Sequence, residues 1–411
     1  MDSIVIGAGM VGVSTALALQ ERGRNVLLVD RGEPGQETSY GNAGLIQTEA
    51  VQPYAIPLSF SRLVRIVLGN APDVVWKPAS AHHWLSSVVS YFRSSLPVNY
   101  ARIVPDYARL ILRATDDHAP LIAASRADAL IRKSGYIQAY RSAKGLDAAL
   151  TSASGIFKRY DVPYAVLEAD ELQAMEPNLR LRMQGAIHYT DVWSCSSPGD
   201  LVKCYAGLFV ARGGKIATAT ARSLGQGSSG WRLATEQGQF EAEEVVIALG
   251  PWSRRFLEPL GYRIPMFFKR GYHQHFNTDA GPNHPFMDVD NSTVLSPMIS
   301  GLRVLTAAEL NSIDGKSNYR QIRHSAEIAA QLFDIGGSVE ALPWRGARPC
   351  MPDMLPVIGK ADKHEGLWFN FGHGHQGFTL GPTTGALLAD VMCDLVPQDT
   401  LAAYQRNGLL F

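Results

Sequence analysis

The chain has 411 residues, with 38 basic and 38 acidic side chains and a formal net charge of zero. Hydrophobic residues make up 46% and charged residues 18%, which is enough apolar material for a large core and excludes a disordered chain. The balanced charge argues against nucleic acid as a partner, because phosphate binding usually needs a net basic face. The four cysteines form no CxxC pair and no zinc-like spacing, so neither a metal site nor a disulfide framework is expected.

The first predicted elements form a strand–turn–helix–strand unit. A short apolar run at 3–6 predicts a buried strand and leads directly into Gly7-Ala8-Gly9-Met10-Val11-Gly12. A helical stripe of apolar residues follows, and a second apolar strand at 25–29 ends at Asp30. This is the context that a GxGxxG motif requires if it binds a dinucleotide, and the alternative is a glycine-rich turn in a structural unit.

Each part of this unit has a physical role in dinucleotide binding. Gly7 permits the tight turn, Gly9 lets the backbone approach a pyrophosphate, and Gly12 lets the helix pack closely on the strand. The helix N-terminus offers free N–H groups to phosphates. Asp30 is placed to accept hydrogen bonds from a ribose diol, and although Arg31 follows it, an acid here argues against a 2′-phosphate.

Three further glycine-containing segments are candidates for contact with the cofactor. Residues 37–44 are small and polar and include Ser39, Asn42 and Gly44, which suggests a cofactor lying along the chain; the alternative is an ordinary polar loop. The buried strand at 244–249 ends at Gly250, where backbone can lie against a planar group. A second glycine-rich loop at 372–378 precedes a helix expected from about 382 to 393.

Other predicted elements belong to a different kind of layer. Apolar runs at 266–276 and 302–307 alternate and predict an antiparallel sheet. The segment 60–107 carries aromatic side chains interleaved with basic ones, which is typical of a peripheral membrane surface; the alternative is a helical subdomain with solvated charges. These residues are Trp76, Trp84, Tyr91, Phe92, Arg62, Arg65, Lys77, Arg93 and Arg102.

With these motifs in this order, the chain resembles the D-amino-acid oxidase/glycine oxidase family of flavoproteins, and within it the small subunits of bacterial D-amino acid dehydrogenases. The resemblance covers nearly the whole chain. It rests on the first glycine motif, on residues 37–44, and on the motifs Lys269-Arg270-Gly271-Tyr272, Gly346-Ala347-Arg348-Pro349, Pro356-Val357-Ile358-Gly359 and Gly372-His373-Gly374.

The resemblance implies an α/β fold with a discontinuous Rossmann-like FAD-binding domain at 1–60, 145–260 and 340–411. Residues 61–144 and 261–339 are then expected to form an α+β substrate domain with an antiparallel sheet. FAD is expected to be bound non-covalently. The expected FAD contacts are Gly7, Gly9, Gly12, Asp30, Arg31, Ser39, Asn42, Gly44, Gly250, Gly374, Gln376 and Gly377.

Three residues are expected to face the substrate. Arg348 matches the arginine that clamps the substrate carboxylate in the family, unless it pairs with Asp353 instead. Tyr272 is similar to tyrosines that line the substrate pocket. Glu49 stands where close relatives carry small or neutral residues, so it is either a selector of cationic or hydroxylated substrates or a solvated loop residue.

The activity implied is oxidative deamination of a D-amino acid, with hydride transfer from Cα to the flavin. Alternatives are oxidation of a secondary amine, such as D-proline, D-hydroxyproline or sarcosine, and a non-catalytic flavin-holding subunit of a hetero-oligomer. A quinone or another component of an electron-transfer chain is the expected acceptor if the enzyme is not an oxidase. We expect a cytoplasmic protein, with the segment 60–107 as a contact with the inner face of the membrane.

Overall fold

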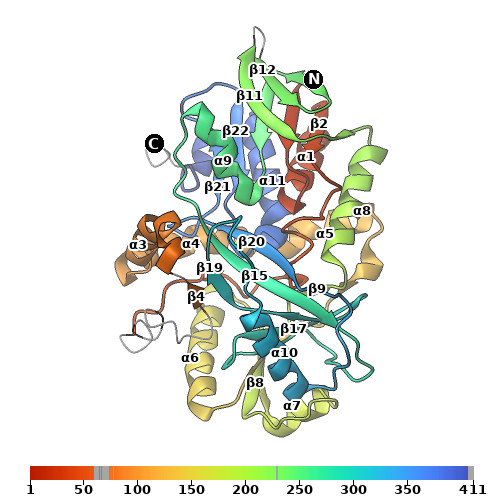
Figure 1. Cartoon of the computed structure of the whole chain (residues 1–411), viewed down its shortest axis with the longest axis vertical. Helices are drawn as coiled ribbons and strands as arrows, with labels where there is room; N and C mark the ends of the chain where they lie inside the picture. Colours follow the sequence, from red (N-terminus) through yellow and green to blue (C-terminus); the bar gives the residue numbers. More distant parts are fainter. Residues whose placement is uncertain (60–63, 65, 67–73, 77, 228–229, 406–411) are drawn as a thin grey trace.

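The computed structural model describes residues 1–59, 64, 66, 74–76, 78–227 and 230–405. Two sheets dominate it. Figure 1 shows them toward opposite ends of the long axis of the molecule, with β15 and β20 of the second sheet reaching the middle. This is the mixed α/β architecture expected from the sequence, with a parallel nucleotide-binding type of sheet and a mainly antiparallel second sheet. The fold-class prediction is therefore confirmed.

The first sheet has six strands within the described residues, in the order β10-β2-β1-β14-β22-β21. All neighbours are parallel except the last pair. Its central strands are buried on both faces, which explains their unbroken apolar sequences. The bounds are Lys215–Thr218 (β10), Val26–Asp30 (β2), Ser3–Ile6 (β1), Glu244–Ile247 (β14), Leu367–Phe371 (β22) and Val357–Lys360 (β21).

Helix α1 (Met10–Glu21) packs on one face of this sheet against α11 (Gly377–Met392) and α8 (Pro198–Ala211). The contact between α1 and α11 is close because α11 presents glycines to it. A Cβ on Gly381 would lie 2.6 Å from the Met10 side chain. Helix α11 begins at Gly377, five residues before the expected start, and Pro382 lies inside it. The prediction treated Pro382 as a first-turn residue, but the helix already begins at the glycine-rich loop.

The second sheet has ten strands within the described residues, in the order β4-β19-β15-β18-β17-β16-β6-β8-β7, and β20 also pairs with β15. One face is covered by α10 (Arg320–Leu332), and the opposite face of β15, with Lys269 and Gly271, lines the large cavity described below. The bounds are Val74–Trp76 (β4), Ala308–Leu310 (β19), Phe267–Phe276 (β15), Gly301–Leu305 (β18), Thr293–Met298 (β17), Phe286–Asp288 (β16), Tyr136–Tyr140 (β6), Gly185–Tyr189 (β8), Tyr164–Glu168 (β7) and Trp344–Cys350 (β20).

The remaining elements are small. Strands β11 (Ala221–Gly227), β12 (Gly230–Thr235) and β13 (Gly238–Ala242) form an antiparallel sheet, and β3 (Leu45–Ile46), β9 (Trp193–Cys195) and β5 (Ile131–Arg132) form another. The other helices are α3 (Leu85–Ser94), α4 (Pro97–Ile111), α5 (Ala114–Ala124), α6 (Ala143–Tyr160), α7 (Ala169–Met175) and α9 (Ser253–Leu257).

Strand pairing bears on the expected domain division. Strand β8 hydrogen bonds to β6 on one side and β7 on the other, and β20 pairs with β15. The ranges 164–189 and 344–350 therefore lie in the second sheet, although the expected division put both in the FAD-binding domain. We propose that the boundary falls near Pro198, where the chain enters α8 and returns to the first sheet.

The segment 60–107 contains helices, as expected, but several of its aromatic side chains point inward. Trp84 and Tyr91 are 7% and 4% exposed and pack with Phe267 and Leu310. Residues 60–63, 65, 67–73 and 77, including Arg62, Arg65 and Lys77, lie outside the described residues. In the part of the chain that the structure describes, no helix has the length and apolarity to cross a membrane.

Candidate active site

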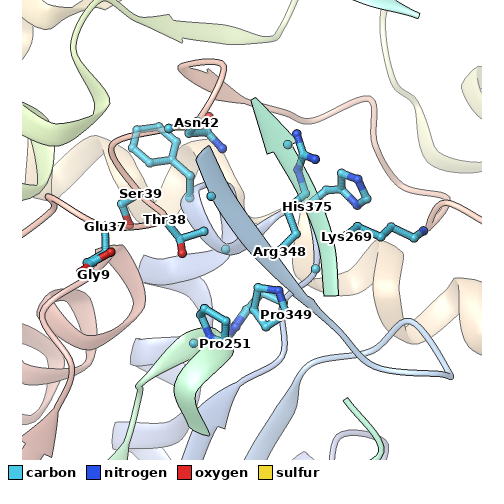
Figure 2. Close-up of a pocket in the computed structure, with 18 of the residues that line it drawn as sticks. Gly9, Glu37, Thr38, Ser39, Asn42, Pro251, Lys269, Arg348, Pro349 and His375 are labelled. Carbon is cyan, nitrogen blue, oxygen red and sulfur yellow. The ribbon is translucent and has the colours of Figure 1, made fainter. Parts of the chain in front are cut away.

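A cavity of about 1070 Å³ lies between the two sheets. It is bordered by the glycine loop after β1, by residues 37–43, by β15 and β20, and by the loop that precedes α11. Figure 2 shows Gly9, Glu37 and Ser39 on one side of this cavity and Lys269, His375 and Arg348 toward the other. We call the first region, formed by Gly7, Gly9, Asp30 and Ser39, the nucleotide end.

At the nucleotide end, the backbone is open at one glycine and tightly packed at another. A Cβ on Gly9 would meet only the Ser39 hydroxyl, at 3.3 Å, so the chain here can be approached closely. Gly12 lies away from the cavity lining, and a Cβ on it would fall 1.7 Å from the Gly7 carbonyl oxygen. Its role is therefore helix–strand packing, whereas Gly7 and Gly9 border the cavity.

Asp30 borders the cavity at the end of β2, and its carboxylate also holds the glycine loop. The Ala8 N–H donates to its Oδ2 at 2.6 Å, and the Gly32 N–H donates to its Oδ1 at 3.0 Å. Carboxylate oxygens have further lone pairs, so these bonds leave capacity for a ribose diol. Arg31, about half exposed, pairs with Glu37 and lies 4.3 Å from the centre of the Trp252 ring.

The loop at 37–44 is fixed by polar contacts from both sides. The Met10 N–H donates to the Ser39 hydroxyl at 3.0 Å, which ties the loop to the start of α1. The Asn42 side chain accepts from the Gly44 N–H at 2.8 Å, and the buried Arg303 donates to the Asn42 carbonyl at 2.6 Å. Ser39 and Asn42 border the cavity; Gly44 instead packs against the backbone of β9, where only a glycine fits.

The second glycine loop lies over the cavity at the N-terminus of α11. Gly374 and Gly377 border the cavity, as does Gly250 at the end of the strand that pairs with β1. Gln376 does not; it is 1% exposed, and its side-chain amide donates to Gln47 at 2.9 Å. Gln376 therefore acts on the cavity through Gln47, which does border it.

Arg348 lies on the cavity face of β20, where it is paired in register with Lys269 of β15. Its guanidinium lies over Gly271, because a Cβ there would be 2.6 Å from Nη1. Nη1 is buried and has no hydrogen-bond partner among the described residues. Burial lowers the pKa of Arg348 from its usual value. Within the described ranges no ion pair of Arg348 is present, so the structure does not contain the alternative Arg348–Asp353 pair.

Tyr272 lies on the other face of the second sheet. Strand residues alternate between faces, so Tyr272 shares the α10 side with Arg270, while Lys269 and Gly271 face the cavity. Its hydroxyl donates to Glu309 at 2.6 Å and accepts from Arg270 at 3.1 Å. Burial raises the pKa of this hydroxyl. Part of Tyr272 still borders the cavity, but its side chain points to the α10 side, where its hydroxyl is committed to a buried ionic network.

The sequence reasoning did not single out Lys269 and His375, although Lys269 stands in a quoted motif and His375 in the glycine-rich loop 372–378. The Lys269 ammonium donates to the Tyr91 hydroxyl at 2.9 Å. The His375 ring lies 4.8 Å from the Tyr54 ring, and its pKa is held well below the usual value by burial and by the charges of Arg348 and Lys269. The available signal was the alternation of residues in the predicted strand, which puts Lys269 on the same face as Gly271.

Glu49 is 6% exposed and does not border the cavity directly. The Gln47 side chain donates to its Oε1, while Oε2 is buried without a hydrogen-bond partner among the described residues. Burial raises the pKa of Glu49 to about 7, against the lowering effect of the Gln47 bond. The expectation of a solvated loop residue is therefore excluded.

These features fit a dinucleotide of the length of FAD. The glycine loop and the α1 N-terminus suit a diphosphate, Asp30 suits a ribose, and the cavity continues past residues 37–43 to the loop before α11. Within the described part of the chain, no cluster of His, Cys, Asp and Glu side chains is arranged to hold a metal ion.

Comparison with known proteins gives a consistent result. Residues 2–391 match the family model named DAO, FAD dependent oxidoreductase. The chain is 29% identical to a D-amino-acid oxidase of Bradyrhizobium diazoefficiens, over 99% of this chain and 98% of the relative. It is 30% identical to D-amino acid dehydrogenase 1 of Mesorhizobium japonicum, over all of both chains. The glycine oxidase of Geobacillus kaustophilus has the same fold, with a TM-score of 0.75, 21% identity and coverage of 98% and 97%.

Proposed function

The chain belongs to the DAO family of FAD-dependent oxidoreductases, and from this premise we propose that it oxidises D-amino acids by removing a hydride from Cα. The cofactor is FAD, and non-covalent attachment is typical of the family. Relatives along the whole chain are named as a D-amino-acid oxidase and as D-amino acid dehydrogenases, which supports the choice of D-amino acids.

The observation that carries the proposal is the unpartnered guanidinium of Arg348. A planar guanidinium binds a carboxylate through two parallel hydrogen bonds, a geometry that a point charge cannot supply. Arg348 faces the cavity from a rigid strand pair, and Gly271 leaves room for its head. An α-carboxylate bound there would compensate a charge that has no acidic partner among the described residues.

FAD, when bound, supplies the two-electron acceptor for the hydride that leaves Cα. The chain's own contribution is positioning, because Arg348 fixes the carboxylate and thereby the orientation of Cα. The substrate amine must also lose a proton, and the product imine then takes up water to give a 2-oxo acid and ammonia. The neutral His375 adds no positive charge near this amine, which favours its uncharged, reactive form.

The test is anaerobic bleaching of the flavin by a panel of D-amino acids, their L-enantiomers, D-proline, D-hydroxyproline and sarcosine. We expect D-amino acids to reduce the flavin fastest. Faster reduction by the secondary amines would assign the second candidate. A protein that retains FAD but is reduced by none of these compounds would be a flavin-holding subunit. Repeating the reduction in air and with a soluble quinone then identifies the electron acceptor.

Membrane contact is a separate proposal, and the structure alters which residues would make it. Because Trp84 and Tyr91 are buried, we propose that the exposed Leu85, Val89 and Val98 of α3 and α4 form the contact, next to the exposed Arg93. Flotation with anionic liposomes should carry the wild-type protein and fail for a variant with Leu85, Val89 and Val98 changed to serine. Equal flotation of both proteins would reject this surface.

A further inference from the structure

Lys269 is a second cation on the substrate side of the cavity. It is the direct cross-strand neighbour of Arg348, and the Arg348 guanidinium lies over Gly271, two residues further along β15. Two residues of a strand span roughly 7 Å. The ammonium of Lys269 and the guanidinium of Arg348 can therefore lie next to each other on one face of the sheet while occupying separate places. We call Lys269 and Arg348 the cationic pair.

Among the described residues, no acidic side chain neutralises the charges of the cationic pair. Lys269 donates to the Tyr91 hydroxyl and lies 4.4 Å from the centre of the Tyr91 ring, but among the described residues neither cation has a carboxylate within ion-pair distance. The buried acid Glu49 is bonded to Gln47. Like charges on adjacent strands destabilise a sheet, and a partly buried ammonium needs a counter-ion. A site built this way is suited to a ligand with more than one negative group.

The diphosphate of FAD is not the counter-ion of the cationic pair. Its diphosphate belongs at the nucleotide end, where α1 begins beside Gly9. Figure 2 shows Gly9 and Lys269 on opposite sides of the cavity, with Arg348 and His375 between them. Burial, and after it the charges of Arg348 and Lys269, lowers the pKa of His375, so the neutral imidazole does not offset the cationic pair.

We propose that Lys269 binds a second carboxylate of the substrate, so that the preferred substrates are acidic amino acids such as D-glutamate and D-aspartate. This inference rests on the proposed function. Arg348 takes the α-carboxylate, and Lys269 takes the side-chain carboxylate, which lies two or three carbon atoms away in these compounds. The apolar side chains near Lys269, including Phe267 and Leu310, contact the intervening methylene groups.

The experiment compares kcat/KM for D-glutamate with kcat/KM for D-alanine, by anaerobic flavin reduction, in Lys269→Met, Lys269→Arg and wild-type protein. We expect the ratio to fall about tenfold to a hundredfold in Lys269→Met, the share of one charge-assisted hydrogen bond, and to recover in part in Lys269→Arg. Lys215→Met, at an exposed position of β10, is the matched control and should keep the wild-type ratio. FAD content is measured in each protein.

Two results would overturn the inference. An unchanged ratio would show that Lys269 does not contact the side chain. A uniform loss for both substrates, together with a lower flavin potential, would show that Lys269 acts on the flavin instead. If no amino acid reduces the flavin, the proposed function fails. The Lys269 assignment can still be tested in that case, because binding of glutarate and of butyrate can be followed through the flavin spectrum. A Lys269→Met protein that keeps the wild-type preference for glutarate would reject it.

Discussion

The nucleotide end and the cationic pair are built from the chain in opposite ways. The nucleotide end comes almost entirely from residues 3–44, where β1, α1 and β2 follow one another without interruption. The cationic pair brings together Lys269 and Arg348, which have 78 residues between them in the sequence, through the register of β15 and β20. The first depends on local backbone geometry and tolerates little change, whereas the second depends on long-range pairing and can be re-tuned by single side chains. Function-defining differences within this fold are therefore expected at the second region.

The largest effect is expected at Arg348. Replacing it with alanine leaves a substrate carboxylate unpaired in a cavity, which costs about 3 kcal/mol, or more than a hundredfold in kcat/KM for flavin reduction. Arg348→Lys should recover only part of this loss, because it keeps the charge but loses the two-pronged geometry. FAD content should not change in either variant.

The matched control is Arg345→Ala, three residues away on the same strand. Its side chain bonds to Gly315 and Ser317 rather than facing Lys269, so flavin reduction should stay at the wild-type rate. If Arg348→Ala retains normal half-saturation and rate, the carboxylate is bound elsewhere and the comparison between the two regions loses its basis.

The next effect tests the rigidity of the nucleotide end. In Gly12→Ala the new methyl group would fall 1.7 Å from the Gly7 carbonyl oxygen, a backbone atom that cannot rotate away. We expect a loss of up to about 3 kcal/mol in the free energy of unfolding and a loss of bound FAD, because α1 must move from β1. Thermal unfolding with and without added FAD measures both.

Gly207→Ala provides the control on α8, where the added Cβ meets nothing within 4 Å. Here the change should stabilise the protein by up to about 1 kcal/mol, since alanine is the better helix former. Equal melting temperatures for the two variants would mean that the packing of the nucleotide end is as adaptable as an exposed helix.

The same contrast explains what the sequence could predict. The roles of Gly7, Gly9 and Gly12 follow from spacing, because each acts on backbone within a few residues of itself. Tyr272 and Lys269 could not be separated in this way. Both stand in one motif, and only the register with β20 and the position of α10 decide which of the two side chains points into the cavity. The environment of Glu49 likewise depends on the distant loop before α11, whose Gln376 donates to Gln47, which in turn donates to Glu49.

The smallest effect concerns Glu49, and it is a pH dependence of the free energy of unfolding. The pKa of Glu49 is raised to about 7 by burial, against a usual value of 4.5, so the folded state holds its proton while the unfolded chain releases it. The free energy of unfolding should therefore fall as pH rises from about 4.5 to 7 and level off above that window, by roughly 1 kcal/mol per pH unit at most. Glu49→Gln removes the titration, so its melting temperature should rise relative to that of the wild type between about pH 5.5 and pH 6.5.

Parallel pH profiles for the two proteins would show that Glu49 ionises normally and that water reaches its unpartnered Oε2. Because Gln keeps the bond to Gln47, a destabilised variant at every pH would instead point to lost packing.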